Sequence, residues 1–447
     1  MRLLASSFPL RQHARMPPLD LRPCPGAGTS DFHLRAGELW CEDVPVARLC
    51  ERFGTPLYVY SGAAIDRRIA AVRAAFGDEA HVCYAVKANS NLAILRRVHQ
   101  RGAGFDLVSG GELERLRAAG LPTAQAVFAG VGKESWEVEA AVAAGILFFN
   151  VESEHELALL SAAGAAAGQR VRVALRLNPD VDAGTHAYIS TGKKENKFGI
   201  AIDRAGPIVD AIVRDRWLQL AGYHVHLGSQ LRAVAPYVEA LQRVGAFADG
   251  AAVRRDGVTH YDLGGGFGIA YGQGEALDVG AGAAALRPLL AARGWRPVTE
   301  PGRYLVGDAG ILVTAVLGEK RQGGTDFLLV DAAMNDLMRP ALYQAEHPIV
   351  PVAAHHGDSR LVDVVGPVCE TGDFLGKKRM LPACRRGDLL AVLGAGAYGA
   401  SMASNYNTRR RPAEVLVDGH TAVLVRKRET FAELFANELD AHETFHA

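Results

Sequence analysis

The sequence predicts an α/β fold: a (β/α)8 TIM-like barrel with a second, mainly β, sandwich-like domain. Between residues 48 and 300, short runs of β-forming residues alternate with stretches whose apolar residues recur at helical spacing. After Pro301 the runs stay short and β-rich, but few helical stretches separate them. The length of 447 residues also exceeds a single hydrophobic core, which stops growing at roughly 250 to 300 residues.

The barrel strands are predicted from nine candidate segments. Eight is the number that closes such a barrel, so the first candidate, residues 56–60, is assigned outside it. An open doubly wound sheet is the alternative. The eight barrel candidates are residues 81–87, 104–108, 126–129, 147–151, 171–178, 221–226, 259–263 and 296–300. The helical stretches between them include residues 63–76, 110–119 and 152–167.

The second domain is predicted from short β-rich runs at 305–317, 327–330, 361–365, 389–393, 415–417 and 422–425, with a helical segment at 430–437. We therefore expect a barrel domain at 57–300 and a β-rich domain made of 31–56 plus 301–447. Residues 1–30 are Arg-rich with one acidic residue and are expected to form a disordered tail.

The composition argues against several classes of partner. Lys plus Arg equals Asp plus Glu at 49 each, so no net charge attracts nucleic acid or an anionic membrane. No uninterrupted apolar run reaches the length of a membrane span. The six cysteines are scattered without metal-ligand spacing, which suits a reducing compartment. We expect a cytoplasmic protein that acts on a small molecule, with neither nucleic acid nor a membrane as partner.

One lysine, Lys87, ends the first predicted barrel strand, and the polar residues 89–91 follow it as a turn into a helix. Burial lowers the pKa of a lysine, and the neutral amine can attack a carbonyl group such as that of an aldehyde cofactor. A lysine at a strand end can also simply extend to solvent. The residue alone leaves both interpretations open.

The ends of the last barrel strands carry groups suited to an anion. Gly264, Gly265 and Gly266 follow the seventh strand, where uncovered backbone N–H groups can approach a phosphate closely. Arg303 follows the eighth strand, and barrels place phosphate sites after these two strands. A plain flexible turn is the alternative for the glycines.

Glu300 ends the eighth strand, where its carboxylate could keep the nitrogen of a pyridine ring protonated while His226 stacks on the ring. An ordinary ion pair between Glu300 and Arg303 is one alternative. A metal pair of His224 and His226 on one strand face is another. Barrel hydrolases carry such a pair on their first strand, whereas this pair is on the sixth, so no metal is expected.

Residues 394–399 match G-x-G-x-x-G, a dinucleotide-binding pattern. The residues that follow, 401–412, are rich in Ser, Asn and Arg and do not predict a packed helix. We therefore expect no dinucleotide here.

Several motifs, in one order along the chain from about Asp31, resemble the fold-type III pyridoxal-phosphate decarboxylases. They are Y-A-V-K-A-N at 84–89, H-V-H-L-G-S-Q at 224–230, D-L-G-G-G-F-G at 262–268, E-P-G-R at 300–303, G-P-V-C-E-T-G-D at 366–373, G-A-Y-G at 396–399 and S-N-Y-N-T-R-R-R-P-A-E-V-L at 404–416. The resemblance implies the cofactor pyridoxal 5'-phosphate and a homodimer whose active sites are shared between subunits.

The resemblance also implies roles for individual residues. Lys87 would hold the cofactor as a Schiff base, His226 would stack on its ring, Glu300 would face the ring nitrogen and Cys369 would donate a proton. The implied cofactor contacts are Lys87, His226, Ser229, Gly265, Gly266, Glu300, Pro301, Gly302, Arg303 and Tyr398. The implied substrate contacts are Arg303, Arg339, Tyr343, Glu370 and Tyr398, with Cys369 and Glu370 supplied by the other subunit. The family usually has Glu-Ser after the Cys, and Glu370-Thr371 here keeps a hydroxyl group.

The leading expectation is decarboxylation of meso-2,6-diaminopimelate to L-lysine and CO2, the last step of lysine biosynthesis. The second amino-acid head of this substrate needs Arg303 and Arg339 for its carboxylate and Glu370 for its ammonium group. A decarboxylase of ornithine, lysine, arginine or carboxynorspermidine is the alternative, since such enzymes share the cofactor residues. Two other classes remain open: a non-catalytic pyridoxal-phosphate carrier and a metal-dependent hydrolase.

Overall fold

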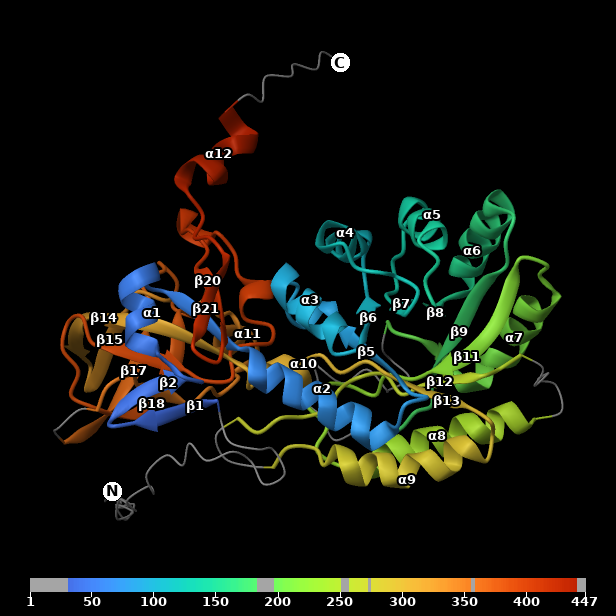
Figure 1. Ribbon diagram of the computed structural model, residues 1–447, viewed down its shortest axis with the longest axis horizontal. Helices are drawn as coiled ribbons and strands as arrows, with labels where there is room; N and C mark the ends of the chain where they lie inside the picture. Colours follow the sequence, from blue (N-terminus) through green and yellow to red (C-terminus); the bar gives the residue numbers. More distant parts are fainter. Residues whose placement is uncertain (1–30, 183–196, 251–256, 272–274, 355–357, 440–447) are drawn as a thin grey trace, which may run out of the picture.

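The computed structural model describes residues 31–182, 197–250, 257–271, 275–354 and 358–439, and the expected tail at 1–30 lies outside them. Figure 1 shows a ring of parallel strands with helices around it and, beside it, a mainly β body. This arrangement confirms the predicted fold class.

Eight parallel strands form the barrel. Each pairs with the next along the ring, and pairing of the last strand with the first completes the closure. The strands are β5 (His81–Ala85), β6 (Gly104–Leu107), β7 (Ala126–Phe128), β8 (Phe148–Val151), β9 (Val171–Asn178), β11 (Leu218–His224), β12 (His260–Asp262) and β13 (Arg296–Thr299). A two-residue strand, β10 (Ile200–Ala201), pairs with the end of β9.

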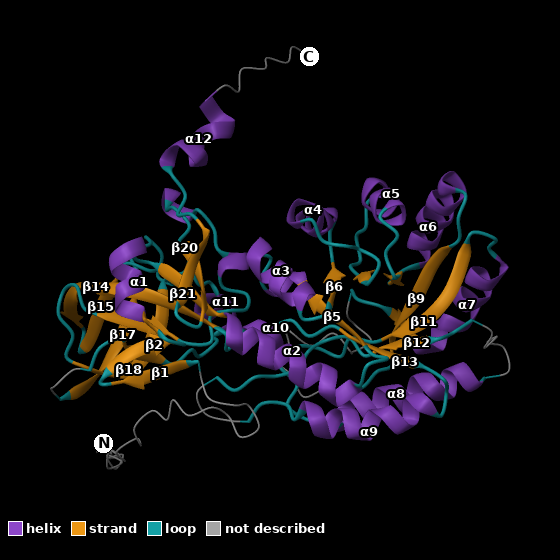
Figure 2. Ribbon diagram, viewed as in Figure 1, coloured by secondary structure: helices purple, strands orange, loops and turns teal. Residues whose placement is uncertain are grey.

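Helices cover the outside of the barrel (Figure 2). They are α2 (Gly62–Phe76), α3 (Leu92–Gln100), α4 (Gly110–Ala119), α5 (Ser135–Ala143), α6 (Glu154–Ala167), α7 (Ala205–Arg214), α8 (Ala235–Asp249) and α9 (Val279–Ala291). Short polar side chains begin several of them: Ser61, Asn91 and Asp278 each accept a hydrogen bond from a backbone amide of the first turn. The barrel strands are buried on both faces, as expected where helices pack on a parallel sheet.

The second domain is built on a sheet with the long strand β14 (Gly310–Gln322) at its centre. The first half of β14 pairs with β4 and β19 and the second half with β15, and a bulge between Val316 and Gly318 separates the halves. The other strands are β4 (Leu57–Ser61), β15 (Thr325–Val330), β16 (Ile349–Pro351), β17 (Ser359–Val365), β18 (Phe374–Pro382), β19 (Leu389–Val392), β20 (Ala413–Asp418) and β21 (Thr421–Arg426).

Chain segments on both sides of the barrel contribute to this second domain. Strand β4 lies between β14 and β20, so the range 57–300 assigned to the barrel begins with a strand of the other sheet. We propose to place the domain boundary after Ser61.

The remaining elements are β1 (Phe32–Arg35), β2 (Glu38–Cys41), β3 (Val44–Pro45), α1 (Val46–Phe53), α10 (Arg303–Val306), α11 (Arg339–Tyr343), α12 (Phe431–Leu439) and the 3-10 turns η1 (Val86–Ala88), η3 (Ile202–Arg204), η4 (Ala400–Met402) and η5 (Tyr406–Thr408).

Some predicted strand ends differ from the structure. The strand predicted at 81–87 ends at Ala85, so Lys87 lies in the 3-10 turn η1. The strand predicted at 221–226 ends at His224, and the strand predicted at 305–317 begins as the helix α10. Strand β18 was not predicted because three consecutive basic residues, 377–379, interrupt the apolar alternation of an edge strand.

The segment that matched G-x-G-x-x-G joins the two bodies, and the 3-10 turns η4 and η5, not an α-helix, lie between it and β20. The carbonyl oxygen of Gly396 accepts a hydrogen bond from the Asn89 side chain at 3.1 Å, and the Tyr398 amide donates to the carbonyl oxygen of Ala88 at 2.8 Å. A Cβ atom on Gly396 would lie 1.9 Å from the carbonyl oxygen of Val306. Glycine is required there because two backbone segments touch.

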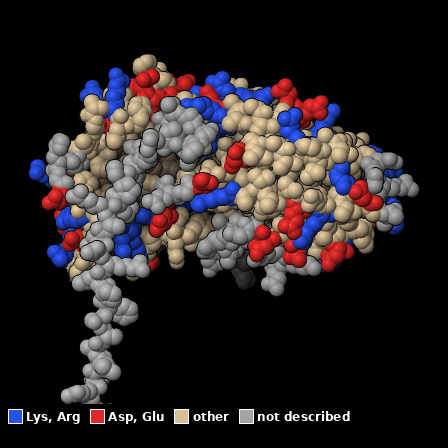
Figure 3. All heavy atoms as spheres, turned by 90° about the horizontal axis from the view of Figure 1, so that it is seen from below, with Lys and Arg blue, Asp and Glu red and all other residues tan. Residues whose placement is uncertain are grey.

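Acidic and basic side chains are interspersed on the face shown in Figure 3. Within the part of the chain that the structure describes, no helix combines the length and the apolar character needed to cross a bilayer.

The backbone contact at Gly396 predicts the effect of a single added methyl group. Gly396→Ala should lower the free energy of unfolding by about 1 to 3 kcal/mol, because neither backbone segment can move freely. Gly206→Ala, in α7 with open space around the site, is the matched control and should be neutral or slightly stabilising. Denaturant unfolding measures both, and equal stability of the two variants would contradict the assigned contact.

Candidate active site

Lys87 lies at the barrel mouth, where its Nζ contacts the buried carboxylate of Asp106 at the end of β6. Its side chain is 34% exposed, which leaves one side open to a ligand. Burial alone would lower the pKa of Lys87, but Asp106 and Glu300 raise this pKa above its ordinary value. At Lys87 the two carboxylates therefore outweigh the lowering that burial causes. Before Lys87 can attack an aldehyde, its proton must leave.

Glu300, directly after β13, is a buried carboxylate surrounded by nitrogen atoms of other strands. The amide nitrogen of Asn150 donates to it at 3.0 Å, and the rings of His224 and His226 approach it at 3.5 and 3.8 Å. Burial favours the neutral form, but His224, His226 and Lys87 hold the pKa of Glu300 well below its usual range. The structure therefore keeps this carboxylate ionised.

The neighbouring acid Asp262 takes the opposite state. Burial and the charge of Glu300 raise the pKa of Asp262 well above its ordinary value. Its Oδ1 accepts the backbone amide of Gly264 at 2.9 Å, which fixes the start of the glycine turn. Glu300 makes no ion pair with Arg303 among the described residues, which argues against the simple ion-pair alternative.

His226 lies in the loop after β11 and is held as a neutral ring. Burial lowers its pKa to about 4. Its Nδ1 accepts the Gly265 amide at 3.2 Å, so the ring proton is on Nε2. Ligand atoms of His224, His226 and Glu300 lie within 4.8 Å of one another, as a metal site would require. A metal there would have to displace the Gly265 hydrogen bond from the Nδ1 lone pair.

The glycine turn is the part of the site that fits a phosphate. A Cβ atom on Gly265 or Gly266 would lie 2.2 Å from a carbonyl oxygen of a neighbouring strand end, so only glycine allows this approach. The amide of Gly266 donates to no other described residue. Arg303 borders the same region and donates from Nη2 to the hydroxyl of Ser229 at 3.1 Å. An amine, an ionised carboxylate and this anion-binding turn around one mouth fit the parts of pyridoxal phosphate.

Arg303 and Arg339 meet on the other side of the mouth. The Nη1 atoms of both residues donate to the hydroxyl of Tyr271, each at 2.7 Å. The Tyr398 ring lies 4.8 Å from the Arg303 guanidinium, and His347 approaches Arg339 at 3.0 Å. No carboxylate of the described residues lies within ion-pair distance of either arginine. Within the described part of the chain, the pair is therefore a dicationic site without an anionic partner.

The remaining predicted contacts around the mouth come from α10, α11 and the turn before α10. A Cβ atom on Gly302 would lie 3.0 Å from the Cβ atoms of Ala85 and Ala88, so this turn packs directly on the Lys87 turn. The carbonyl oxygen of Pro301 accepts the amide of Ala85 at 3.4 Å. Tyr343 ends α11. Burial lowers the pKa of Arg303, but Tyr271 and Tyr398, with a smaller contribution from Tyr343, raise it above its ordinary value.

Cys369 and Glu370 do not join this cluster within one chain. Both are exposed, in the loop after β17. Asp373 shapes the loop by accepting the Val368 amide at 2.7 Å, and the Cys369 amide donates to Asn407 at 2.8 Å. Among the described residues, no hydrogen bond or ion pair connects either side chain to the barrel mouth.

A second buried lysine, Lys133, lies in the loop after β7. Its Nζ donates to the carbonyl oxygens of Gly130 and Asn150 at 2.7 and 2.9 Å and to Glu156 at 2.8 Å. These three acceptors use all three ammonium protons. The ammonium group of Lys133 is therefore fully hydrogen-bonded within the protein, whereas the side chain of Lys87 is partly exposed.

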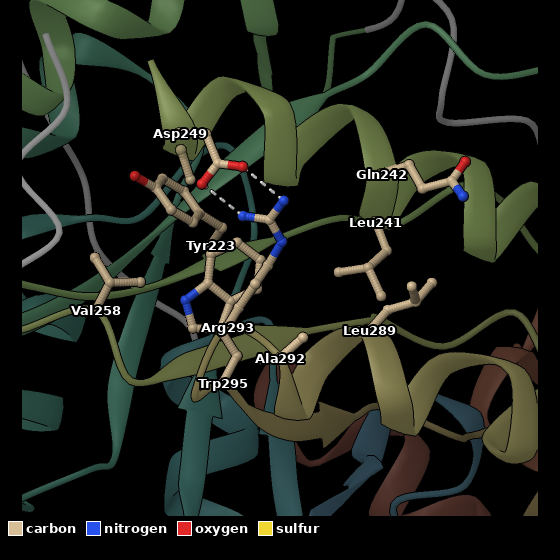
Figure 4. Close-up of a pocket in the computed structure, with 10 residues that line it drawn as sticks. Tyr223, Leu241, Gln242, Asp249, Val258, Leu289, Ala292, Arg293 and Trp295 are labelled. Atoms are coloured by element: carbon tan, nitrogen blue, oxygen red, sulfur yellow. Dashed lines mark hydrogen bonds and ion pairs between the residues drawn. The ribbon is translucent and has the colours of Figure 1, made fainter. Parts of the chain in front are cut away.

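A cavity of about 420 Å3 lies elsewhere, between α8 and α9 on the outside of the barrel (Figure 4). Leu241 and Leu289 line it, and Arg293 pairs with Asp249 beside Trp295. None of the predicted site residues lines this cavity.

Comparison with known proteins agrees with this geometry. Residues 62–307 match the family described as pyridoxal-dependent decarboxylase, pyridoxal binding domain. The chain belongs to the pyridoxal-dependent decarboxylases, and its cofactor is pyridoxal phosphate.

Within that family, the similar proteins share one name, diaminopimelate decarboxylase. The chain is 50% identical over 402 residues to diaminopimelate decarboxylase of Neisseria meningitidis, covering 90% of this chain and 99% of that protein. It is also 50% identical to the Pseudomonas aeruginosa enzyme of the same name, covering 91% and 98%. The crystal structure of Helicobacter pylori diaminopimelate decarboxylase complexed with L-lysine matches with a TM-score of 0.84 and 38% identity, covering 88% and 99%.

Several residues of the site were not predicted from the sequence. Asp106, Asn150 and Asp262 are polar residues inside or at the end of otherwise apolar strands, and that contrast was a usable signal. Tyr271 and His347 lie in loops whose sequence has no comparable signal.

We expect Lys87 to be the residue that holds the cofactor. Lys87→Ala should abolish covalent attachment of pyridoxal phosphate and nearly all turnover, because Lys133 is fully bonded. Borohydride reduction of the wild-type protein followed by peptide mapping identifies the labelled lysine. A label that persists in the variant, with activity, would assign the attachment to another residue.

Proposed function

We propose that this protein decarboxylates meso-2,6-diaminopimelate to L-lysine and CO2. The observation that best supports this proposal is the Arg303–Arg339 pair across the barrel mouth from Lys87, without a carboxylate partner among the described residues, which suits a substrate with a carboxylate far from the reacting carbon. Relatives at 50% identity over nearly their whole length support the same reaction. A lysine/ornithine decarboxylase structure is only 22% identical and supports the fold alone.

Bound pyridoxal phosphate supplies an aldehyde that captures the substrate amine and a ring that accepts the electron pair left when CO2 departs. Glu300, whose pKa is held well below its usual range, would face the ring nitrogen and hold a proton there. His226, whose pKa burial lowers to about 4, would stack on the ring without adding charge. Lys87 would hold the cofactor when no substrate is bound. Arg303 and Arg339 bind the far carboxylate.

The proton that the substrate carbon then needs comes from Cys369, and Glu370 binds the far ammonium group. Both residues lie on an exposed loop. We propose that a second subunit brings this loop to the barrel mouth, in a homodimer with shared active sites. Since the five described cysteines are free thiols, we also propose a cytoplasmic location in the lysine biosynthetic pathway.

The test of the substrate is CO2 release from meso-diaminopimelate, lysine, ornithine and arginine, each supplied separately to the pyridoxal-phosphate-loaded protein. We expect release from diaminopimelate far above the other three. Preferred turnover of ornithine or arginine would replace this proposal with the alternative substrate.

Arg339→Ala should raise the KM for diaminopimelate by roughly ten- to a hundredfold, because a charge-assisted contact is worth about 1.5 to 3 kcal/mol. Cofactor content, measured by absorbance, should not change. Arg293→Ala is the control: its partners line the outer cavity, and its KM should equal that of the wild type. Loss of cofactor with an unchanged KM would show that Arg339 belongs to a different site.

Two inactive variants should restore each other's activity if the sites are shared. Co-expressed Lys87→Ala and Cys369→Ala subunits should give about a quarter of the wild-type activity, because about half of the dimers are mixed and each carries one intact site. The matched control pairs Lys87→Ala with Glu300→Ala, two barrel residues of the same chain, which leave no intact site in any dimer. Differently tagged subunits allow mixed dimers to be isolated and assayed. Inactive mixed dimers in the first pair would mean that each site is built within one chain.

A further inference from the structure

The two arginines of the proposed substrate site are themselves held by residues that have no assigned role. The hydroxyl of Tyr271 accepts a hydrogen bond from the Nη1 atom of each guanidinium, Arg303 and Arg339, at 2.7 Å. The Tyr271 ring lies 4.9 Å from the Arg339 guanidinium as well. A neutral oxygen atom thus holds two cations together that would otherwise repel each other.

His347 holds Arg339 through a hydrogen bond. Its Nδ1 lies 2.8 Å from the carbonyl oxygen of Leu393, which can only accept, so Nδ1 carries the proton. Its Nε2 atom is then unprotonated and accepts a hydrogen bond from Nη1 of Arg339 at 3.0 Å. The ring is fully buried and packs edge-on against Tyr271, with centroids 5.1 Å apart.

The G-x-G-x-x-G segment supplies the space for this arrangement. Gly394 has a φ of +65°, and a Cβ atom there would lie 3.2 Å from two carbon atoms of the Tyr271 ring. The Tyr398 ring of the same segment lies 4.8 Å from the Arg303 guanidinium. The segment that resembled a nucleotide-binding loop therefore lies against the arginine pair.

The arrangement leaves two buried donor groups of the arginine pair without a hydrogen-bond partner among the described residues. The Nε atoms of both arginines are buried and have no hydrogen-bond partner among the described residues. Two buried guanidinium donors of this kind suit a carboxylate, which accepts two parallel hydrogen bonds.

We propose that Tyr271 and His347 are positioning residues that hold Arg303 and Arg339 as a preformed carboxylate site, and that this site selects a substrate with a second carboxylate. The inference rests on the proposed function and deepens it. Neither residue touches the reacting carbon. Both act through the arginines.

The test separates carboxylate recognition from turnover by comparing two ligands that differ by one carboxylate. L-lysine retains the far carboxylate of the substrate, and cadaverine is the same diamine without it. Both dissociation constants are read from the cofactor absorbance of the cofactor-loaded protein. The ratio of the dissociation constant of cadaverine to that of L-lysine measures how much the far carboxylate contributes to binding. Tyr271→Phe should reduce this ratio by roughly tenfold and raise the KM for diaminopimelate by a similar factor, with kcat within about twofold.

Three further variants make the result specific. Tyr261→Phe removes a buried hydroxyl that has no partner among the described residues, and it should leave the ratio unchanged. His347→Gln keeps an acceptor and a donor and should stay near the wild-type ratio, whereas His347→Leu should lower it as Tyr271→Phe does. If His347→Leu does not fold, Tyr271→Phe against Tyr261→Phe still decides the matter.

An unchanged ratio in Tyr271→Phe would overturn the inference, and so would equal losses in His347→Gln and His347→Leu. Failure of the proposed function gives a different result, since the wild-type protein would then release no CO2 from diaminopimelate. The ligand ratio would still report whether Tyr271 positions a carboxylate site.

Discussion

The ionised carboxylate of Glu300 is the constraint on which the rest of the site depends. A buried carboxylate is costly unless nearby groups favour its charge. Here those groups come from three other strands or their following turns: Lys87, Asn150, and the pair His224 and His226. Only a closed barrel brings side chains so distant in sequence to one point, so closure of the sheet and ionisation of Glu300 are linked.

The barrel mouth is divided by charge. The acids Asp106, Asp262 and Glu300 lie on the strand ends, and Arg303 and Arg339 lie on the helices that follow the barrel or belong to the second domain. This division matches a cofactor with a basic ring nitrogen and a substrate with a far carboxylate. The glycine-rich segment 394–399 brings the second domain against both parts of the mouth, the Lys87 turn and the arginine pair.

Much of this arrangement could be predicted because residues that follow parallel strands all lie at the carboxyl-terminal end of the barrel. Lys87, His226, Gly265 and Glu300 were found by this rule, and the structure brings them to one mouth. Their assigned roles stay predictions. The raised pKa of Lys87 could not be predicted from burial alone, because it depends on Asp106, whose position opposite Lys87 depends on the pairing of β5 with β6.

Tyr271 and His347 could not be predicted because their role exists only in the folded chain. Each reaches the arginines from a loop, and no periodic pattern connects residues 271, 303, 339 and 347. The pair they hold has a physical cost, because two like charges that share one acceptor oxygen repel each other. The fold sustains that repulsion before any ligand arrives. We expect a bound carboxylate to relieve the repulsion and an amine without the carboxylate to leave it in place, which would favour the substrate with the second carboxylate.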